Sequence, residues 1–195
     1  MPKKKSLKLA ATHFKGAANT VLDFFAKTSG LKEDYHIWCT DFAVIRLYAE
    51  FEVLMLETLA GAINNDTTTI SSTLSVPFLK HLNEDVCKFL VVGTGFFDFK
   101  GRDGLIKVLR KYVPQTHYLV AIIKEEKFKN SLEKLSALRN FAAHQSEPSR
   151  AAAAEAVGGD RIGSAGAWLK RQGRFEAIVK DLIAIAEEIE KKAPY

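Results

Sequence analysis

The sequence predicts an all-α protein, a helical bundle of four to five main helices with short extra helices and loops. Three observations support this fold class. Apolar residues recur at spacings of three and four over long stretches, the alternation typical of β-strands is scarce, and turn-forming residues separate the stretches. The chain has 195 residues, of which 47% are hydrophobic, so it is long enough for one domain with a sizeable core.

The first two helices are predicted over residues 7–28 and over residues 34–64. The first is moderately amphipathic and ends near the Ser-Gly pair at residues 29–30. The second carries an apolar stripe that repeats every three or four residues, made of Ile45, Tyr48, Phe51, Met55 and Leu59. Further leucines make this helix apolar on several sides, which predicts a place in the centre of the bundle.

The rest of the chain predicts shorter elements before and after one more long helical region. NNDTTTISST is rich in turn and capping residues, and GTGFFDFKGRDG predicts a turn or short hairpin, because it lacks the Gly-Lys-Ser/Thr ending of a phosphate-binding loop. Helical patterns follow over residues 105–114, 117–145, 149–157 and 175–189, the second of them as one or two helices.

The net charge of +5 is concentrated at the start of the chain. Five of the 28 basic residues and no acidic residue lie within residues 1–15, which leaves 23 basic against 23 acidic residues. We therefore divide the chain into a basic N-terminal tail, residues 1–15, and a single helical domain, residues 16–195. The tail is either a disordered solubilising end or a helper in phosphate binding, and any phosphate-binding surface on the domain has to be a local patch.

Composition also narrows the expected environment. No run approaches the roughly 18 to 20 apolar residues of a membrane span, and the basic start is not followed by the apolar stretch of a secretory signal. Cys39 and Cys87 are too few for a disulfide framework and too far apart for a metal-binding pair. We expect a cytoplasmic protein with no membrane contact, no metal and no cofactor.

Three polar residues share the end of a predicted helix in the stretch LSALRNFAAHQSEPSR. Asn140 and His144 are one turn apart on one face, and the long side chain of Arg139 reaches the same side. A guanidinium binds phosphate through planar, permanently charged donors, and histidine exchanges protons near neutral pH. Such a set can cleave RNA without a metal ion. His144 would move the protons, Arg139 would offset the phosphoryl charge and Asn140 would orient either group.

The same residues also fit an ordinary helix end. A histidine in the last turn interacts favourably with the helix dipole, and the QSEP sequence at residues 145–148 is a natural stop. Local features alone leave both interpretations open.

The stretch resembles the signature of the HEPN superfamily (higher eukaryotes and prokaryotes nucleotide-binding), in which an arginine and a polar residue are followed by three residues of any type and a histidine. Arg139, Asn140 and His144 fill these positions, with the common asparagine in second place. DFAVIRLYAEFEVLMLETL and SAGAWLKRQGRFEAIVKDL are similar to segments of HEPN proteins of the RiboL-PSP type. The resemblance covers most of residues 34–190, although only the motif is specific.

The resemblance implies a metal-independent endoribonuclease that leaves a 2′,3′-cyclic phosphate and a 5′-hydroxyl, acting as a toxin or an antiviral (phage defence) effector. It also implies a homodimer with a composite site, because each chain supplies one motif histidine, whereas in-line attack benefits from both a base and an acid. We expect RNA, such as tRNA, as substrate, and an antitoxin or regulatory protein as a further partner. Ser146 stands where nucleotidyltransferase-paired toxins often carry tyrosine, which argues against inactivation by nucleotidylation there.

Further candidates lie around the motif. We expect four exposed cations that follow it to contact RNA: Arg150, Lys170, Arg171 and Arg174. Glu52 and Ser146 are candidate supporting polar residues. The Glu33-x-x-His36 spacing used by di-iron bundles has no second copy, so we assign Glu33 to a helix N-terminus.

Two alternatives to an active ribonuclease remain. The first is a non-catalytic HEPN bundle that serves as an RNA-binding or protein-interaction module. The second is a subunit whose ligand or partner controls it.

Overall fold

The computed structural model describes residues 6–159 and 162–194 of the chain. Within these residues it has ten helices and no strand, which confirms the predicted all-α bundle. Four helices are long, namely α1 (Leu7–Thr28), α2 (Glu33–Asn65), α7 (Glu126–His144) and α10 (Arg174–Lys192). Six are short, namely α3 (Thr68–Leu74), α4 (Glu84–Val92), α5 (Gly101–Leu109), α6 (Tyr118–Lys124), α8 (Glu147–Val157) and α9 (Ala165–Leu169).

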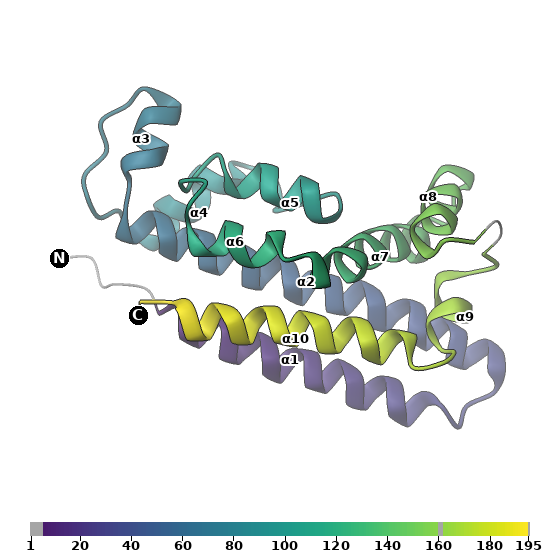
Figure 1. The fold of residues 1–195 in the computed structure, drawn as a ribbon. Helices are drawn as coiled ribbons and strands as arrows, with labels where there is room; N and C mark the ends of the chain where they lie inside the picture. Colours follow the sequence, from purple (N-terminus) through teal and green to yellow (C-terminus); the bar gives the residue numbers. More distant parts are fainter. Residues whose placement is uncertain (1–5, 160–161, 195) are drawn as a thin grey trace.

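The long helix α2 forms the spine of the bundle. It runs the length of the molecule behind α1 and α10, and it packs against α1, α7, α4 and α9 (Figure 1). The start of α1 and the end of α10 lie at one end, where Lys15 Nζ is 2.6 Å from a carboxylate oxygen of Glu190. The Leu7–Lys15 segment, which our domain division places in the basic tail, forms the first turns of α1. The three lysines at residues 3–5 lie outside the described residues.

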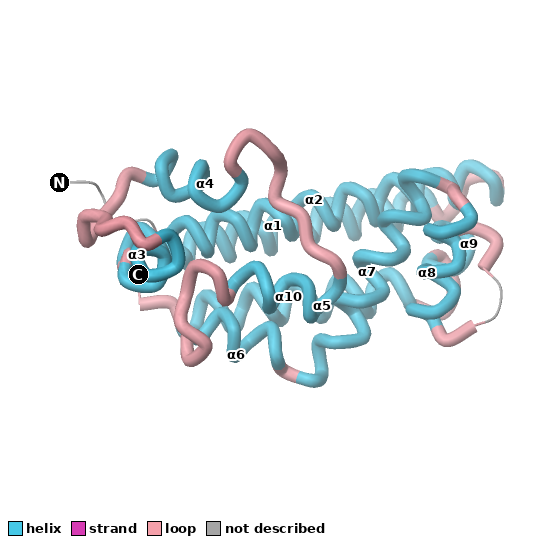
Figure 2. The backbone as a smooth tube through the Cα atoms, turned by 90° about the horizontal axis from the view of Figure 1, so that it is seen from above, coloured by secondary structure: helices cyan, strands magenta, loops and turns pink. Residues whose placement is uncertain are grey.

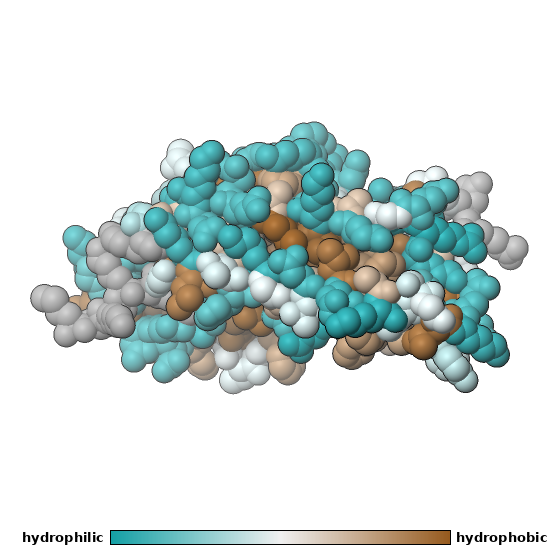
Figure 3. Space-filling view, turned by 90° about the horizontal axis from the view of Figure 1, so that it is seen from below, coloured by the Kyte–Doolittle hydropathy of each residue, from teal (hydrophilic) through white to brown (hydrophobic). Residues whose placement is uncertain are grey.

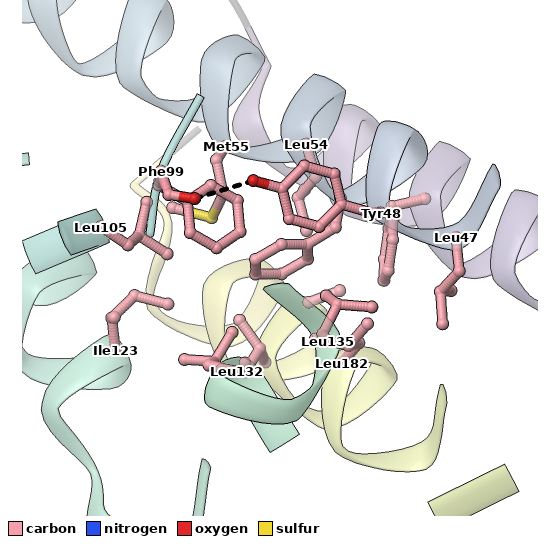
Figure 4. Packing of buried hydrophobic residues seen from close by; sticks show 14 of the residues in the cluster. Leu47, Tyr48, Leu54, Met55, Phe99, Leu105, Ile123, Leu132, Leu135 and Leu182 are labelled. Carbon is pink, nitrogen blue, oxygen red and sulfur yellow. Dashed lines mark hydrogen bonds between the residues drawn. The ribbon is translucent and has the colours of Figure 1, made fainter. Parts of the chain in front are cut away.

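The core is centred on the middle of α2. Leu47, Tyr48, Leu54 and Met55 are buried there, close to residues of α7, α10 and the loop before α5 (Figure 4), and Phe51 is buried as well. The ring of Phe99 from that loop stacks on Tyr48 with centroids 5.0 Å apart. Every residue of the predicted apolar stripe except Ile45 is therefore buried, as expected of a central helix.

The two turn-rich stretches are more helical than the sequence predicts, because they contain α3 and the first turn of α5, a helix that the sequence predicts only from residue 105 onward. In NNDTTTISST, the helix α3 forms because Ile70 is drawn into the core, while Thr67 Oγ1 donates to the Leu79 carbonyl at 2.9 Å. In the glycine-rich stretch, residues 93–100 form the loop that crosses over α2 (Figure 2), and α5 then begins at Gly101. No hairpin forms here.

The start of α5 is fixed by a residue from α7. Gly101 has φ +60°, and a Cβ there would collide with the carboxylate of Glu133. Glu133 Oε1 accepts the backbone N–H of Arg102 at 2.9 Å, so it caps a free donor of the helix start. The glycine is required at this position because it permits both the positive φ and the close approach.

The surface is mixed in polarity. On the face seen from below, apolar patches are interrupted by polar side chains (Figure 3). Among the described residues, no helix has the length and apolar character needed to cross a membrane.

Candidate functional site

The α7 motif, defined as Arg139, Asn140 and His144, occupies the last turns of α7. Leu135, Leu138 and Phe141 are buried and fix the inward face of the helix. As a result, Arg139 and Asn140 lie half-buried at the edge of the core, whereas His144 is exposed at the last helical position. The guanidinium of Arg139 is therefore partly enclosed, whereas the imidazole of His144, further along the helix, is accessible to solvent.

Arg139 is held by two neighbours. Its guanidinium carbon lies 4.4 Å from the centroid of the Tyr48 ring, and its Nη1 donates to Asn140 Oδ1 at 2.8 Å. Stacking on an aromatic face and a hydrogen bond to an amide both restrict the guanidinium without neutralising its charge. The role of Asn140 in this structure is thus to orient Arg139.

Tyr48 is in turn anchored by the loop before α5. Its hydroxyl oxygen lies 2.8 Å from the Phe99 carbonyl oxygen and 2.9 Å from Asp98 Oδ1. Burial raises the pKa of Tyr48, and the nearby carboxylates of Asp98 and Glu52 raise it further, so the phenol remains a protonated donor. The platform under Arg139 is therefore rigid and neutral.

Glu52 lies one turn after Tyr48 on α2 and interacts electrostatically with Arg139. Burial raises the pKa of Glu52 to about 7, with Arg139 opposing the rise and Asp98 adding to it. At neutral pH the carboxyl is therefore only partly ionised. The sequence suggests Glu52 as a supporting polar residue of the site, and in the structure it interacts with the arginine of the motif.

The imidazole of His144 makes no hydrogen bond or ion pair within the described part of the chain. Gln145 follows in the left-handed conformation, with φ 49°, and ends α7. Ser146 then starts α8, where its Oγ accepts the backbone N–H of Ser149 at 3.4 Å and its own N–H donates to Ser149 Oγ at 3.1 Å. Ser146 thus has a capping function, and His144 is held out on the short connection between two helices.

The four cations after the motif do not converge on it as a free set. Arg150 pairs with Glu147 at 3.3 Å, and Lys170, whose side chain is 11% exposed, pairs with Glu33 at 2.7 Å. Arg174 stacks on the Trp168 ring at 4.4 Å and donates to the Gln172 side chain at 2.8 Å. Of the four, Arg171 is exposed and forms no hydrogen bond or ion pair with a described residue, although its charge helps to lower the pKa of Glu33.

A hollow of about 500 Å³ opens beside Asn140, between α7, α8 and the start of α5. Its walls include Lys100, Asn130, Ala137 and Asn140. Tyr48, Asp98 and Lys100 were not among the residues predicted for the site. Asp98 could have been found from the FFDF sequence. Successive side chains of an extended segment point to opposite sides, so burial of Phe97 and Phe99 leaves the Asp98 residue between them exposed.

Comparison with protein-family models, curated proteins and solved structures finds no match to this chain. Across the described residues, no three histidine, cysteine or carboxylate side chains gather as they would around a metal ion.

Proposed function

We propose that the protein is a metal-independent endoribonuclease of the HEPN type. The observation that carries the proposal is the arrangement of Arg139, whose charged guanidinium is fixed at the protein surface by the Tyr48 ring and Asn140, five residues before the exposed His144 on the same helix. A fixed cation near an accessible imidazole supplies the two elements that phosphodiester cleavage by an internal nucleophile needs.

In the proposed reaction the ribose 2′-oxygen attacks phosphorus while the bond from phosphorus to the 5′-oxygen breaks. One imidazole accepts the 2′-OH proton, and a second imidazolium donates a proton to the departing 5′-oxygen. Arg139 donates to the non-bridging oxygens as negative charge accumulates on them. The products are a 2′,3′-cyclic phosphate and a 5′-hydroxyl, so no water or metal-bound group is consumed.

Two imidazoles require two chains, because each chain has one motif histidine. We therefore propose a homodimer in which the α7 motifs of two copies face each other around residues 139–146. The exposure of His144 and its neighbours Ala143 and Gln145 leaves this surface available for such a contact. A two-fold axis through this surface would give one cleft with two arginines and two histidines.

The resemblance to HEPN proteins suggests the setting. It points to cleavage of structured RNA such as tRNA in the cytoplasm, during a stress or phage-defence response, under the control of an antitoxin or another regulatory partner. The substrate, the setting and the regulatory partner all follow from this resemblance, and they belong to the proposal.

A non-catalytic interaction module is the second candidate, and one observation favours it. Trp38 and Phe42 on α2 are 63% and 58% exposed, and Tyr35 packs against Trp38 with ring centroids 5.5 Å apart. Exposed aromatic residues of this kind are typical of protein-binding surfaces. In that case the motif would organise a contact and would not cut RNA.

End analysis of cleaved RNA separates the two candidates. Wild type, Arg139→Ala and His144→Ala are incubated with end-labelled tRNA in excess EDTA, after circular dichroism has established that all three are folded. Cleavage by wild type alone, with cyclic-phosphate ends, supports the ribonuclease. Folded, dimeric wild type that cuts no RNA, or equal cleavage by all three, would contradict it.

A further inference from the structure

Three exposed cations gather away from the motif, between α5 and α6. Lys107 on α5, Arg110 at the C-cap of α5 and Lys124 on α6 are exposed and line one hollow of about 510 Å³, which we call the α5–α6 groove. None of the three forms an ion pair with a described residue. Because the chain after residue 15 has no net charge, such a local cluster is the kind of surface on which an anion can bind.

The remaining charged groups of the α5–α6 groove are already paired with each other. Arg102, whose side chain is 13% exposed, donates from Nη1 to Glu126 at 2.7 Å and lies 3.4 Å from Asp103. The groove therefore has four cations against two carboxylates, and the excess charge belongs to the three free side chains. The helix dipoles of α5 and α6 favour a cation at the C-terminal end of each helix. The dipoles do not explain, however, why the cations of both helices line the same hollow.

The α5–α6 groove is connected to the motif along α7. The helix begins at Glu126 in the groove and ends at His144, and residues spaced by three or four between them form one stripe, Asn130, Glu133, Ala137 and Asn140. Eighteen residues of α-helix span about 27 Å. The hollow beside Asn140 is lined by the middle of this stripe, so the α5–α6 groove at the start of the helix is followed by a second hollow on the way to the motif.

The middle of this path suits a sugar or base better than a phosphate. Lys100 is its one cation, and Glu155 of α8 is a carboxylate in the same wall. Glu133 also lines this hollow, where it caps the start of α5. Ala152 and Ala156 keep the α8 wall low. A polyanion lying here would place its phosphates mainly at the two ends, in the α5–α6 groove and at Arg139.

We propose that the α5–α6 groove binds the phosphodiester backbone of single-stranded RNA and that the strand runs along α7 to His144. This inference rests on the proposed function, because it assigns the surface that holds the substrate of the same site. Lysine and arginine would contact non-bridging oxygens and release counterions, which makes the affinity depend on salt. The cations predicted from the sequence would have a smaller role, since most of them are engaged within the protein.

The test compares two triple variants with the same net charge. The groove variant is Lys107→Gln, Arg110→Gln and Lys124→Gln. The control variant is Lys27→Gln, Lys32→Gln and Lys180→Gln, all exposed positions on α1, at the start of α2 and on α10. Both are made with His144→Ala, so that the probe, a fluorescein-labelled single-stranded oligoribonucleotide, stays intact, and the dissociation constant is measured at several salt concentrations.

Loss of three phosphate contacts should weaken binding by about 100-fold at about 0.1 M salt and reduce the slope of log affinity against log salt by about 2. The control variant should stay within about threefold of its parent, because charges outside the contact act only through screened long-range attraction. Equal losses in the groove and control variants would overturn the inference, as would a parent chain that binds no RNA. Groove-dependent binding to phosphatidylserine vesicles in preference to RNA would also overturn it.

The same variants separate this inference from the proposed ribonuclease when His144 is intact. Groove-dependent binding by a protein that never cuts RNA would support the proposed RNA-binding groove and contradict the proposed ribonuclease activity. Cleavage by wild type together with normal binding by the groove variant would support the ribonuclease activity and contradict the proposed RNA-binding groove. Thermal unfolding of every variant establishes that lost binding does not come from lost folding.

Discussion

The two ends of α7 differ in how their charges are held. At its C-terminal end, Arg139 is fixed by an aromatic ring and an amide, and His144 extends into solvent. At its N-terminal end, three cations of the α5–α6 groove are free, while Arg102 is tied to Glu126. A fixed charge is suited to a transition state, in which geometry decides the rate, whereas mobile charges are suited to binding a flexible polyanion.

The difference also shows why proximity in sequence is a poor guide to an RNA surface. Arg150, Lys170 and Arg174 follow the motif along the chain, but they pair with Glu147, with Glu33 and with Trp168. The free cations come from earlier helices that reach α7 through the bundle.

The largest effect is expected from replacing the fixed guanidinium. Arg139→Lys keeps the positive charge but loses the planar donors that stack on Tyr48 and bond to Asn140. We expect the cleavage rate constant at saturating RNA to fall by about 100-fold or more, as when one donor to a developing oxyanion is removed, while the affinity for RNA changes little. Single-turnover cleavage measures both. Arg150→Lys, one turn into α8, is the matched control, and an equal loss there would contradict the assignment.

A smaller effect, dependent on pH, is expected at Glu52. Because the pKa of its carboxyl is raised to about 7 in the folded protein, folding favours its neutral form. Its contribution to stability is therefore greatest below the ordinary glutamate pKa, falls as pH rises, and is lost above about pH 7. Glu52→Gln should raise the free energy of unfolding by about 1 kcal/mol at about pH 8, after allowance for partial exposure, and by little at about pH 5.

Urea unfolding at several pH values measures this difference. RNA affinity supplies a second readout, because ionised Glu52 competes with phosphate for Arg139, so Glu52→Gln should reduce the loss of affinity between about pH 6 and about pH 8. Glu176→Gln, an exposed substitution on α10, is the control. A pH profile that is the same in Glu52→Gln and wild type would show that Glu52 does not sense the charge at the motif.

The smallest effect on catalysis is expected at Ser146. Its side chain caps α8, so Ser146→Ala should lower the free energy of unfolding by about 1 kcal/mol. Because the Ser146 hydroxyl is engaged in this cap, the cleavage rate constant of the folded variant should stay within about threefold of wild type. Ser146→Asp, which retains a capping side chain, should restore stability. A large loss of cleavage in both variants, with stability retained, would show that Ser146 takes part in the reaction and would contradict a role limited to capping.

The long helices were predictable because their signals are local. Periodic apolar residues define α1, α2 and α10, and the motif itself is contiguous in α7. The helix α3 was missed because Thr and Ser favour caps and turns, and the burial of Ile70 overrides that preference. The start of α5 depends on Glu133, which lies 31 residues beyond Arg102 in the chain.

The surroundings of the motif were less predictable for the same physical reason. The raised pKa of Glu52 and the position of Tyr48 under Arg139 both arise from packing between α2 and α7. The α5–α6 groove needs two helices to converge. Such contacts are set by tertiary packing, so they cannot be predicted from residue spacing along one helix.

The most direct test of the division between the two ends of α7 measures binding and cleavage in the same RNA. The dissociation constant and the single-turnover rate constant are determined in excess EDTA for wild type, His144→Ala and the groove variant. We predict that His144→Ala binds normally but cuts at least about 1,000-fold more slowly, and that the groove variant binds about 100-fold more weakly but cuts at the wild-type rate once saturated. Normal cleavage by His144→Ala, or normal binding by the groove variant, would contradict this account.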